Sequence, residues 1–415
     1  MRIVFVTPDY PDENSLSGSG VGTFVYNISH GLAEFGHDSI VLVHGQPENH
    51  SKKIGEHIIV RYLKHVGNIH YYVSKLPLIG RSSILIGLIK QWEIGQTVLA
   101  ELLIVLKETG TKDIILESPE GHGNFLLANR NRIIPYIISI HGSVILHKQA
   151  IGQNKGFLLW MLAKINEKIM QGASAIICPS RFTTEFYTRF FKKNVFYCPN
   201  PVSLPAITDK KPELTLPHNP VVVLSVSALS WSKGTDILRD AIVKISQVTR
   251  NIQFVIVGAD SDIKKKDLES FFGAHQLLDL VNIVGYVPWG EIVEWYKSCD
   301  VFVSASRFET FGQTIAEAML SEKPVIATNI GAIPELLNNG KSGILVEPGD
   351  SSALAQEILE LAGDLKKRRE LGSKGMEKIL AENSPVRAIQ ERISLYQNIL
   401  DESKNKAIYL INKSV

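Results

Sequence analysis

The sequence predicts an α/β protein built from two doubly wound domains. A strand, a glycine-rich turn, a helix and a second strand open the chain at Arg2, and the same alternation starts again at Val221. The length points the same way, because 415 residues with 45% apolar composition exceed what one hydrophobic core usually takes. We therefore expect an N-terminal domain over residues 1–203 and a C-terminal domain over 204–384, joined by a segment rich in proline and charge.

The first domain is expected to begin with a buried strand over Arg2–Thr7 and a helix over Val21–Phe35 that ends at Gly36. Glycines before and inside this helix, among them Gly22, allow either close packing on the sheet or a close backbone approach to a ligand. Dinucleotide-binding dehydrogenases carry an acidic residue after the second strand, where this chain has His44, so a nicotinamide site is disfavoured. Further strands are predicted at Ser39–Val43, Asp113–Glu117, Ile133–His141 and Ala175–Pro179.

The second domain is expected to contain five or six parallel strands. A helix should follow Lys233, a short one should cover Trp289–Ser298, and the chain should be helical after Ser351. A last helix starts at Ser384-Pro385, and its apolar stripe is followed by a predicted loose tail from Lys404. The clearest strands are Val221–Ser227, Ile252–Val257, Val281–Val284 and Asp300–Ser304, and the stripe consists of Ile389, Ile393 and Tyr396.

Charge and cysteine content exclude several classes of protein. The net charge of +2 is too balanced to indicate nucleic-acid binding over the whole surface. Residues 1–200 carry 20 Lys and Arg against 15 Asp and Glu, a net +5, which fits an anionic acceptor or a membrane surface but also ordinary scatter. The three cysteines lack the spacing of a metal site, and their odd number is typical of a reducing compartment.

The chain is expected in the cytoplasm, either in solution or peripherally associated with a membrane. Its first residues resemble a strand rather than a signal peptide, because the apolar run before Pro8 is only five residues long. The most apolar long region, Leu76–Leu106, contains four charged residues and should not span a bilayer.

The stretch Ser304–Asp350 concentrates the candidate chemistry. Glu309 is predicted in a strand-to-helix loop and Glu317 on the following helix, four residues after Gln313 and on the same face. The first-turn backbone amides of that helix would suit a phosphate, and a nucleotide sugar has hydroxyls at both ends and phosphates in between. The spacing alone also fits two solvated surface glutamates. The amides belong to Gly312, Gln313 and Thr314.

Three segments of this stretch closely resemble the C-terminal half of the retaining glycosyltransferases of family four. In that family an E-x7-E pattern falls on Glu309 and Glu317 without a gap, and the opening segment Gly20–Asp38 resembles the start of the same family. The resemblance implies the GT-B fold, in which two Rossmann-like doubly wound domains face each other across a cleft. It also implies that a terminal helix over about 385–403 packs back on the first domain. The three segments are Glu309–Met319, Lys323–Glu335 and Gly343–Asp350.

The resemblance implies a role for each candidate residue. Lys233 would bind the diphosphate, Glu317 the ribose hydroxyls and Glu309 the hydroxyls of the transferred sugar. His141 would approach that sugar from the first domain, although a lone histidine at a strand end is more often structural. The remaining donor contacts would come from Phe311, Gly312, Gln313, Thr314 and Gly22, with Glu120 and His122 as acceptor contacts.

One position departs from the family. The family usually carries an arginine beside the phosphates where this chain has Ala228. Arg307 is a nearby cation that would take its place only if its side chain reached the phosphates. No metal or other cofactor is expected, since a lysine and backbone dipoles can balance the diphosphate charge. Asp260-Ser261-Asp262 has the form of a metal-binding motif, but its position after a strand favours a turn.

These residues predict a retaining, metal-independent glycosyltransferase that uses a UDP- or GDP-linked sugar. The acceptor would be a hydroxyl on a sugar, a lipid-linked molecule or another compound in glycan, glycolipid or polysaccharide biosynthesis. Ala228 leaves open a nucleotide-sugar-binding protein with weak or no transferase activity. A sugar-nucleotide epimerase of the same architecture ranks last, because those enzymes lack the E-x7-E pattern in this form.

Overall fold

The computed structural model divides the chain into two compact units. It describes residues 1–11, 19–64, 75, 83–110, 112–120, 134–142, 164, 167–191, 194–205 and 220–413. Unit 1 comprises Met1–Pro179, Thr183–Pro199 and Val386–Val415, and unit 2 comprises Ser180–Phe182 and Asn200–Pro385. Each unit has its own sheet of mainly parallel strands, which confirms the predicted α/β class with two doubly wound domains.

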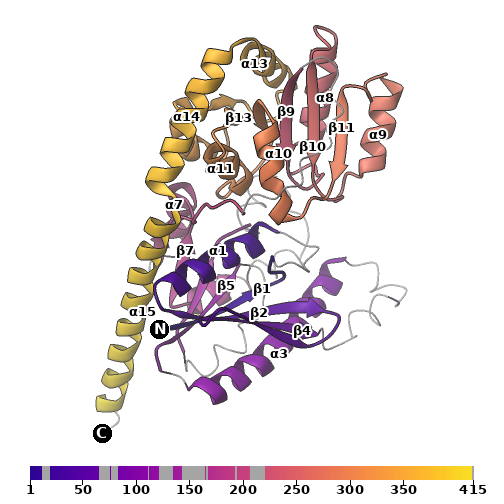
Figure 1. The fold of residues 1–415 in the computed structure, drawn as a ribbon. Helices are drawn as coiled ribbons and strands as arrows, with labels where there is room; N and C mark the ends of the chain where they lie inside the picture. The colour runs from indigo at the N-terminus through magenta and orange to yellow at the C-terminus, as the bar shows by residue number, and fades with distance from the viewer. Residues whose placement is uncertain are drawn as a thin grey trace. The chain divides into compact units, whose positions relative to one another are not determined.

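Unit 1 is organised on an eight-stranded sheet with the order β3-β4-β2-β1-β5-β6-β7-β8. All neighbours pair in parallel except β3 and β4, which form an antiparallel pair. The helices α1 (Gly20–Glu34) and α3 (Ser83–Thr109) lie on opposite faces of this sheet (Figure 1). The strands are β1 (Arg2–Thr7), β2 (Asp38–Gln46), β3 (His50–Ile54), β4 (Ile58–Lys64), β5 (Ile114–Pro119), β6 (Tyr136–Ser139), β7 (Ala175–Cys178) and β8 (Val195–Tyr197).

The C-terminal helix α15 (Pro385–Lys413) packs on the sheet of unit 1. Ile389 and Tyr396 are fully buried in its core, and Gly31 of α1 lets the Ile389 side chain approach, because an added Cβ would lie 2.5 Å from Ile389 Cγ1. The predicted tail from Lys404 is wrong, since the helix continues to Lys413. No glycine or proline interrupts the sequence there, so nothing ends the helix earlier. Helix α7 (Arg181–Phe190) lies between β7 and β8 in the chain.

A buried ion pair fastens α15 to β5. Arg392 Nη1 lies 2.5 Å from Glu117 Oε1, and both side chains are at most 2% exposed. Tyr396 and Ser139 donate hydrogen bonds to the same carboxylate. Burial alone would lower the pKa of Arg392, but the Glu117 carboxylate raises it above its usual range, so the guanidinium keeps its charge.

Unit 2 is organised on a six-stranded parallel sheet with the order β11-β10-β9-β12-β13-β14. Both faces are covered, because Val223 of β9 packs in one core cluster with α8, α9 and α13, while Val222 and Leu224 pack in another with α10 and α11. Six strands agree with the predicted number. They are β9 (Val221–Val226), β10 (Ile252–Val257), β11 (Val281–Gly285), β12 (Val301–Ser304), β13 (Val325–Thr328) and β14 (Ile344–Val346).

The helices of unit 2 follow the strands in regular alternation (Figure 1). The predicted helix at Trp289–Ser298 divides into a 3-10 turn and α10. The α-helices are α8 (Thr235–Ser246), α9 (Lys265–Ala274), α10 (Ile292–Ser298), α11 (Gln313–Leu320), α12 (Ile333–Leu336), α13 (Ser351–Gly363) and α14 (Leu365–Glu382), and the 3-10 turns are Trp289–Glu291 and Asn338–Gly340.

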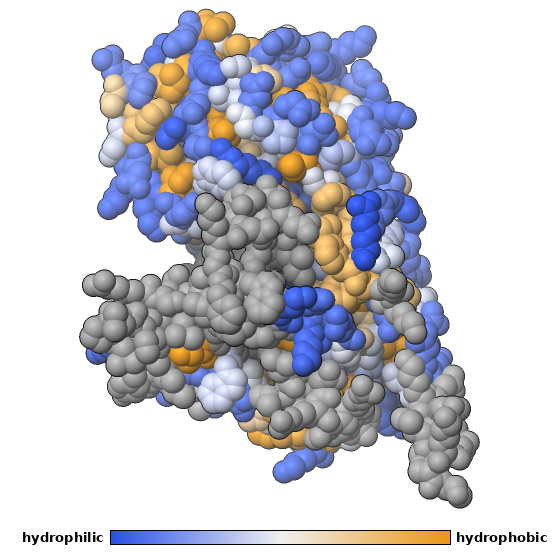
Figure 2. Space-filling view, turned by 180° about the vertical axis from the view of Figure 1, so that it is seen from behind, coloured by the Kyte–Doolittle hydropathy of each residue, from blue (hydrophilic) through white to orange (hydrophobic). Residues whose placement is uncertain are grey.

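The face of unit 2 that Figure 2 shows is mostly hydrophilic. In the upper part of Figure 2, blue residues predominate and orange ones are scattered among them. Within the described ranges, no helix has the length and apolar character needed to cross a membrane.

Candidate active site

Lys233 and Glu309 meet at the carboxyl ends of two neighbouring strands. Lys233 lies in the loop after β9, and Glu309 lies in the loop between β12 and α11. These strands pair with each other, and from them the sheet continues in opposite directions to β10 and β13. Such a switch in strand order is where doubly wound sheets bind ligands. The Lys233 ammonium is 2.7 Å from Glu309 Oε1, so the two predicted residues form an ion pair.

Glycines and a serine fix the loops that carry this pair. Ser306 Oγ donates to Glu309 Oε1 over 2.8 Å, which orients the carboxylate. Gly234 has a φ of +69°, and an added Cβ would lie 1.9 Å from the Ala305 carbonyl oxygen, so the two loops meet backbone to backbone. Gly331, with a φ of +59°, allows the same close approach to the Glu309 carbonyl.

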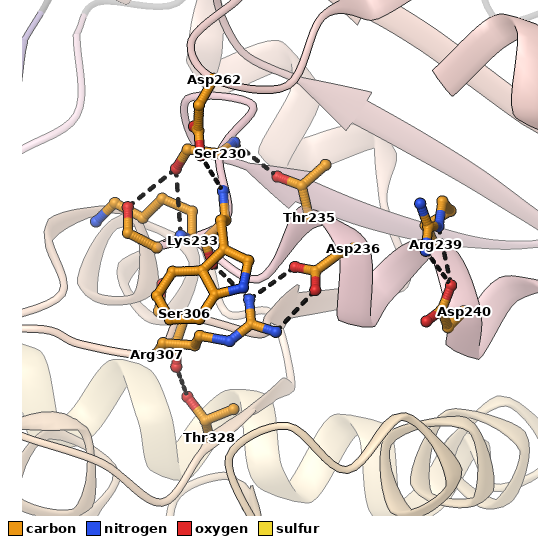
Figure 3. Close-up of polar contacts among 12 residues, drawn as sticks. Ser230, Lys233, Thr235, Asp236, Arg239, Asp240, Asp262, Ser306, Arg307 and Thr328 are labelled. Atoms are coloured by element: carbon orange, nitrogen blue, oxygen red, sulfur yellow. Dashed lines mark hydrogen bonds and ion pairs between the residues drawn. The ribbon is translucent and has the colours of Figure 1, made fainter. Parts of the chain in front are cut away.

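Arg307 is held by an aspartate on α8. Its Nη1 and Nη2 each lie 2.7 Å from an oxygen of Asp236, and Figure 3 shows the guanidinium pointing at that carboxylate. Its Nη1 also donates to the Trp231 carbonyl over 2.5 Å, and the guanidinium lies 4.2 Å from the centre of the Trp231 ring. In this arrangement Asp236 balances the charge of Arg307. The structure thus directs the Arg307 guanidinium to Asp236.

Glu317 lies on the buried face of α11 and is 3% exposed. Gln313 Nε2 donates to its Oε1 over 3.0 Å, which confirms that these two residues share a face, and Tyr296 O–H donates to its Oε2 over 2.9 Å. Burial raises the pKa of Glu317 to about 7, against the lowering effect of these two hydrogen bonds. The carboxyl group therefore changes its protonation near neutral pH.

The first turn of α11 presents backbone amides at the same strand ends. Gly312 precedes the helix with a φ of +94°, and no side chain caps the helix. The amides of Gln313 and Thr314 lie in this turn, as the sequence predicts. The Phe311 ring is buried in the core with Ile315, so a contact of Phe311 with a ligand would come from its backbone.

The candidates in unit 1 follow its central strands. His141 lies two residues after the end of β6 and packs on Phe24, with ring centres 4.2 Å apart. Glu120 follows β5 and is 8% exposed, and it accepts a 2.6 Å hydrogen bond from Tyr187 O–H. The burial and the hydrogen bond fit a structural role for Glu120 as well as the predicted contact with the acceptor. His122 lies outside the described residues.

Gly22 lies in the first turn of α1 beneath a carboxylate that we did not predict. Asp9 accepts hydrogen bonds from the backbone and hydroxyl of Ser19, at 2.6 and 2.5 Å. A Cβ on Gly22 would lie 2.8 Å from the Asp9 carboxylate, and burial raises the pKa of Asp9. Gly22 thus leaves room for the Asp9 carboxylate at the N-terminus of α1. The signal was available, since Asp9 directly follows the loop start after the first strand.

Three further residues of the site were missed because they act through a partner. Tyr296 binds Glu317, Ser306 binds Glu309 and Asp236 binds Arg307, and none of them belongs to a pattern in the sequence. Asp260 and Asp262 accept hydrogen bonds from the backbone amides of Lys265 and Trp231, as expected for a turn. Across the part of the chain that the structure describes, no group of three His, Cys, Asp or Glu residues could hold a metal ion.

Comparison with known proteins assigns a family to both units. The model of the glycosyl transferases group 1 matches residues 206–378, and that of glycosyltransferase family 4 matches residues 18–204. An uncharacterized glycosyltransferase of Methanocaldococcus jannaschii is 30% identical over 260 residues, which is 62% of this chain and 67% of that one. The chain belongs to the family 4 glycosyltransferases. The alpha-D-kanosaminyltransferase of Streptomyces kanamyceticus is 27% identical to this glycosyltransferase over 43% of this chain and 46% of that one.

Solved structures confirm the GT-B fold of this glycosyltransferase. Sucrose-phosphate synthase from Thermosynechococcus elongatus superimposes with a TM-score of 0.77, at 20% identity over 97% of this chain and 99% of that one. The HepE protein of Anabaena, in complex with UDP-glucose, superimposes with a TM-score of 0.69 at 19% identity, over 96% of this chain and 100% of that one. At these identities the likeness supports the fold and not the substrates.

Proposed function

We propose that this glycosyltransferase moves a sugar from a nucleoside-diphosphate sugar, linked to UDP or GDP, to an acceptor hydroxyl with retention of anomeric configuration. The ion pair of Lys233 and Glu309 at the strand switch carries the proposal, because it puts a cation and a hydrogen-bonding carboxylate at the place where such sheets bind ligands. The family's HepE structure with UDP-glucose supports a nucleotide sugar as the donor.

Each residue of the site has a proposed part in the reaction. The Lys233 ammonium and the first-turn amides of α11 stabilise the diphosphate as the anomeric bond breaks. Glu309 accepts hydrogen bonds from the hydroxyls of the transferred sugar, and His141 contacts that sugar from the other domain. Glu317 accepts hydrogen bonds from the ribose. The departing phosphate receives the proton of the acceptor hydroxyl, so the residues of the chain orient and stabilise without a metal ion.

A nucleotide screen tests the donor. Thermal unfolding with UDP, GDP and ADP and their sugars should raise the melting temperature for one nucleotide, since a ligand of the native state stabilises it. Release of nucleotide from that sugar, with and without acceptors, then reports turnover. No shift with any of the nucleotides would contradict the proposal.

A nucleotide-sugar-binding protein with weak transfer is the second candidate. It draws on Ala228 and on the pairing of Arg307 with Asp236, which leave the proposed diphosphate site with one fewer cation than its family usually has. Stoichiometric binding without released nucleotide would favour it over a transferase with normal turnover.

The affinity for nucleotide is expected to depend on Glu317 ionisation. The pKa of Glu317 in the folded protein is about 7, above the ordinary value of 4.5, so the folded state favours the protonated carboxyl group. This group therefore contributes stability below pH 4.5, and the contribution is lost as the pH rises through 7. Only the carboxylate can accept two ribose hydrogen bonds. Isothermal calorimetry should therefore show that the affinity of the wild-type protein for the nucleotide falls nearly tenfold from pH 7.5 to 6, beyond any change that Glu317→Gln shows over the same range. Parallel pH profiles of the two proteins would contradict this role.

A further inference from the structure

Trp231 exposes a large aromatic ring beside the proposed reaction site. It lies in the loop after β9, two residues before Lys233, and it is 43% exposed. Its ring stacks on Arg307, which is two residues before Glu309. Trp231 and Arg307 thus belong to the two loops that carry Lys233 and Glu309, and the indole joins these loops through its contact with Arg307.

The protein holds Trp231 through one face of its ring and through its backbone. The Arg307 guanidinium covers one ring face at 4.2 Å, and two hydrogen bonds to Asp236 fix that guanidinium. Asp262 accepts a hydrogen bond from the Trp231 backbone amide over 3.1 Å. The exposed surface of the ring thus lies on the opposite face and the edge. An aromatic surface fixed in advance loses little side-chain entropy when a ligand binds.

The order of groups along the donor decides which ligand this face meets. Under the proposed function, the ribose is at Glu317 on α11, and the phosphates and transferred sugar are at Lys233 and Glu309. The nucleobase then extends beyond Glu317 on α11, which covers the opposite face of the sheet from α8, the helix that follows the Trp231 loop. What comes next to the transferred sugar on the Trp231 side is the acceptor.

We propose that the open face of Trp231 is the platform on which a sugar ring of the acceptor stacks, so that the acceptor is a carbohydrate. The C–H groups on one face of a pyranose form an apolar surface that matches an indole in size and shape. A polyol or a peptide hydroxyl offers no such flat surface. This inference rests on the proposed function for the place of the acceptor.

Direct binding and turnover test the platform separately. With UDP present, saturation-transfer NMR of methyl α- and β-glycosides of glucose, galactose, mannose and N-acetylglucosamine should show ring contacts for at least one, and none for glycerol. Trp231→Ala should abolish the contact and Trp231→Phe should keep part of it. Trp92→Ala, which removes an indole 54% exposed on α3, is the matched control and should bind as wild type does. The Trp231 backbone groups that bind Arg307 and Asp262 remain in these variants.

In steady-state kinetics, the loss of the indole should change the KM for the acceptor but not the affinity for the donor nucleotide. For the glycoside that binds, Trp231→Ala should raise the acceptor KM about tenfold, with Trp231→Phe within about threefold, while the affinity for UDP stays as in wild type. An unchanged glycoside contact in Trp231→Ala, a loss of UDP affinity instead, or the absence of any glycoside contact with the wild-type protein would overturn the platform. Absence of nucleotide release from every donor sugar would overturn the proposed function, and the NMR contact would still decide the platform.

Discussion

Replacing Lys233 with alanine is expected to lower the rate of sugar transfer by about a hundredfold or more. The ammonium pairs with one oxygen of Glu309, whereas both oxygens of Asp236 and the Trp231 carbonyl hold the neighbouring Arg307, so we expect Lys233 to be the cation that turns to a bound diphosphate. A charge that stabilises the leaving group in the transition state affects kcat more than substrate binding. Steady-state kinetics with the donor found in the nucleotide screen measures the effect.

Two variants make this result specific. Lys244 lies at the far end of α8 and donates hydrogen bonds to the hydroxyls of Ser351 and Ser352. Lys244→Ala removes a lysine away from the site, so this variant should transfer sugar at nearly the wild-type rate. Glu309→Gln should lose turnover on the same scale as Lys233→Ala, because it alters the other member of the pair. Near-normal transfer by purified Lys233→Ala or Glu309→Gln would remove these residues from the mechanism.

Much of the fold was predictable because it follows from local apolar patterns. Runs such as Ile252–Val257 are wholly buried strands in a parallel sheet, and such strands are continuous in hydrophobicity. The patterns did not locate β3, which is polar and at an edge, or β4, with which it pairs. They also did not locate β8, β13 and β14, which have only three or four residues each. Their pairing depends on neighbours distant in sequence, which no local window contains.

The sequence could predict the site residues whose type and family pattern indicate a role, but not the partners that orient them. Lys233 and Glu309 are 76 positions apart, and their pairing follows from the strand order, which the sequence implied through its family resemblance. The direction of the Arg307 side chain did not follow, because it depends on Asp236 on a helix 71 positions earlier. The Asp9 carboxylate near Gly22 was missed although Asp9 lies just after the first strand, since a glycine-rich turn indicates that some group approaches closely but not which one.

The buried ion pair of unit 1 leads to the largest expected effect on stability. Arg392→Met would leave the Glu117 carboxylate in the core without its cation, with both side chains at most 2% exposed in the intact protein. Removing one partner of a buried pair typically costs about 3–5 kcal/mol, because the other charge stays buried without compensation. Urea unfolding followed by circular dichroism should show this loss, with faster proteolysis of α15 as a sign that the helix has detached.

The same helix supplies the control for this prediction. Arg387 pairs with Glu391 at the surface, with side chains 54% and 39% exposed, and Arg387→Ala should cost less than about 1 kcal/mol because water screens the pair. Glu117→Leu combined with Arg392→Met should recover part of the loss, since no charge then remains buried, but not all of it, because Tyr396 and Ser139 lose their acceptor. If Arg392→Met were no less stable than Arg387→Ala, the attachment of α15 would rest on the apolar contacts of Ile389 and Tyr396 instead.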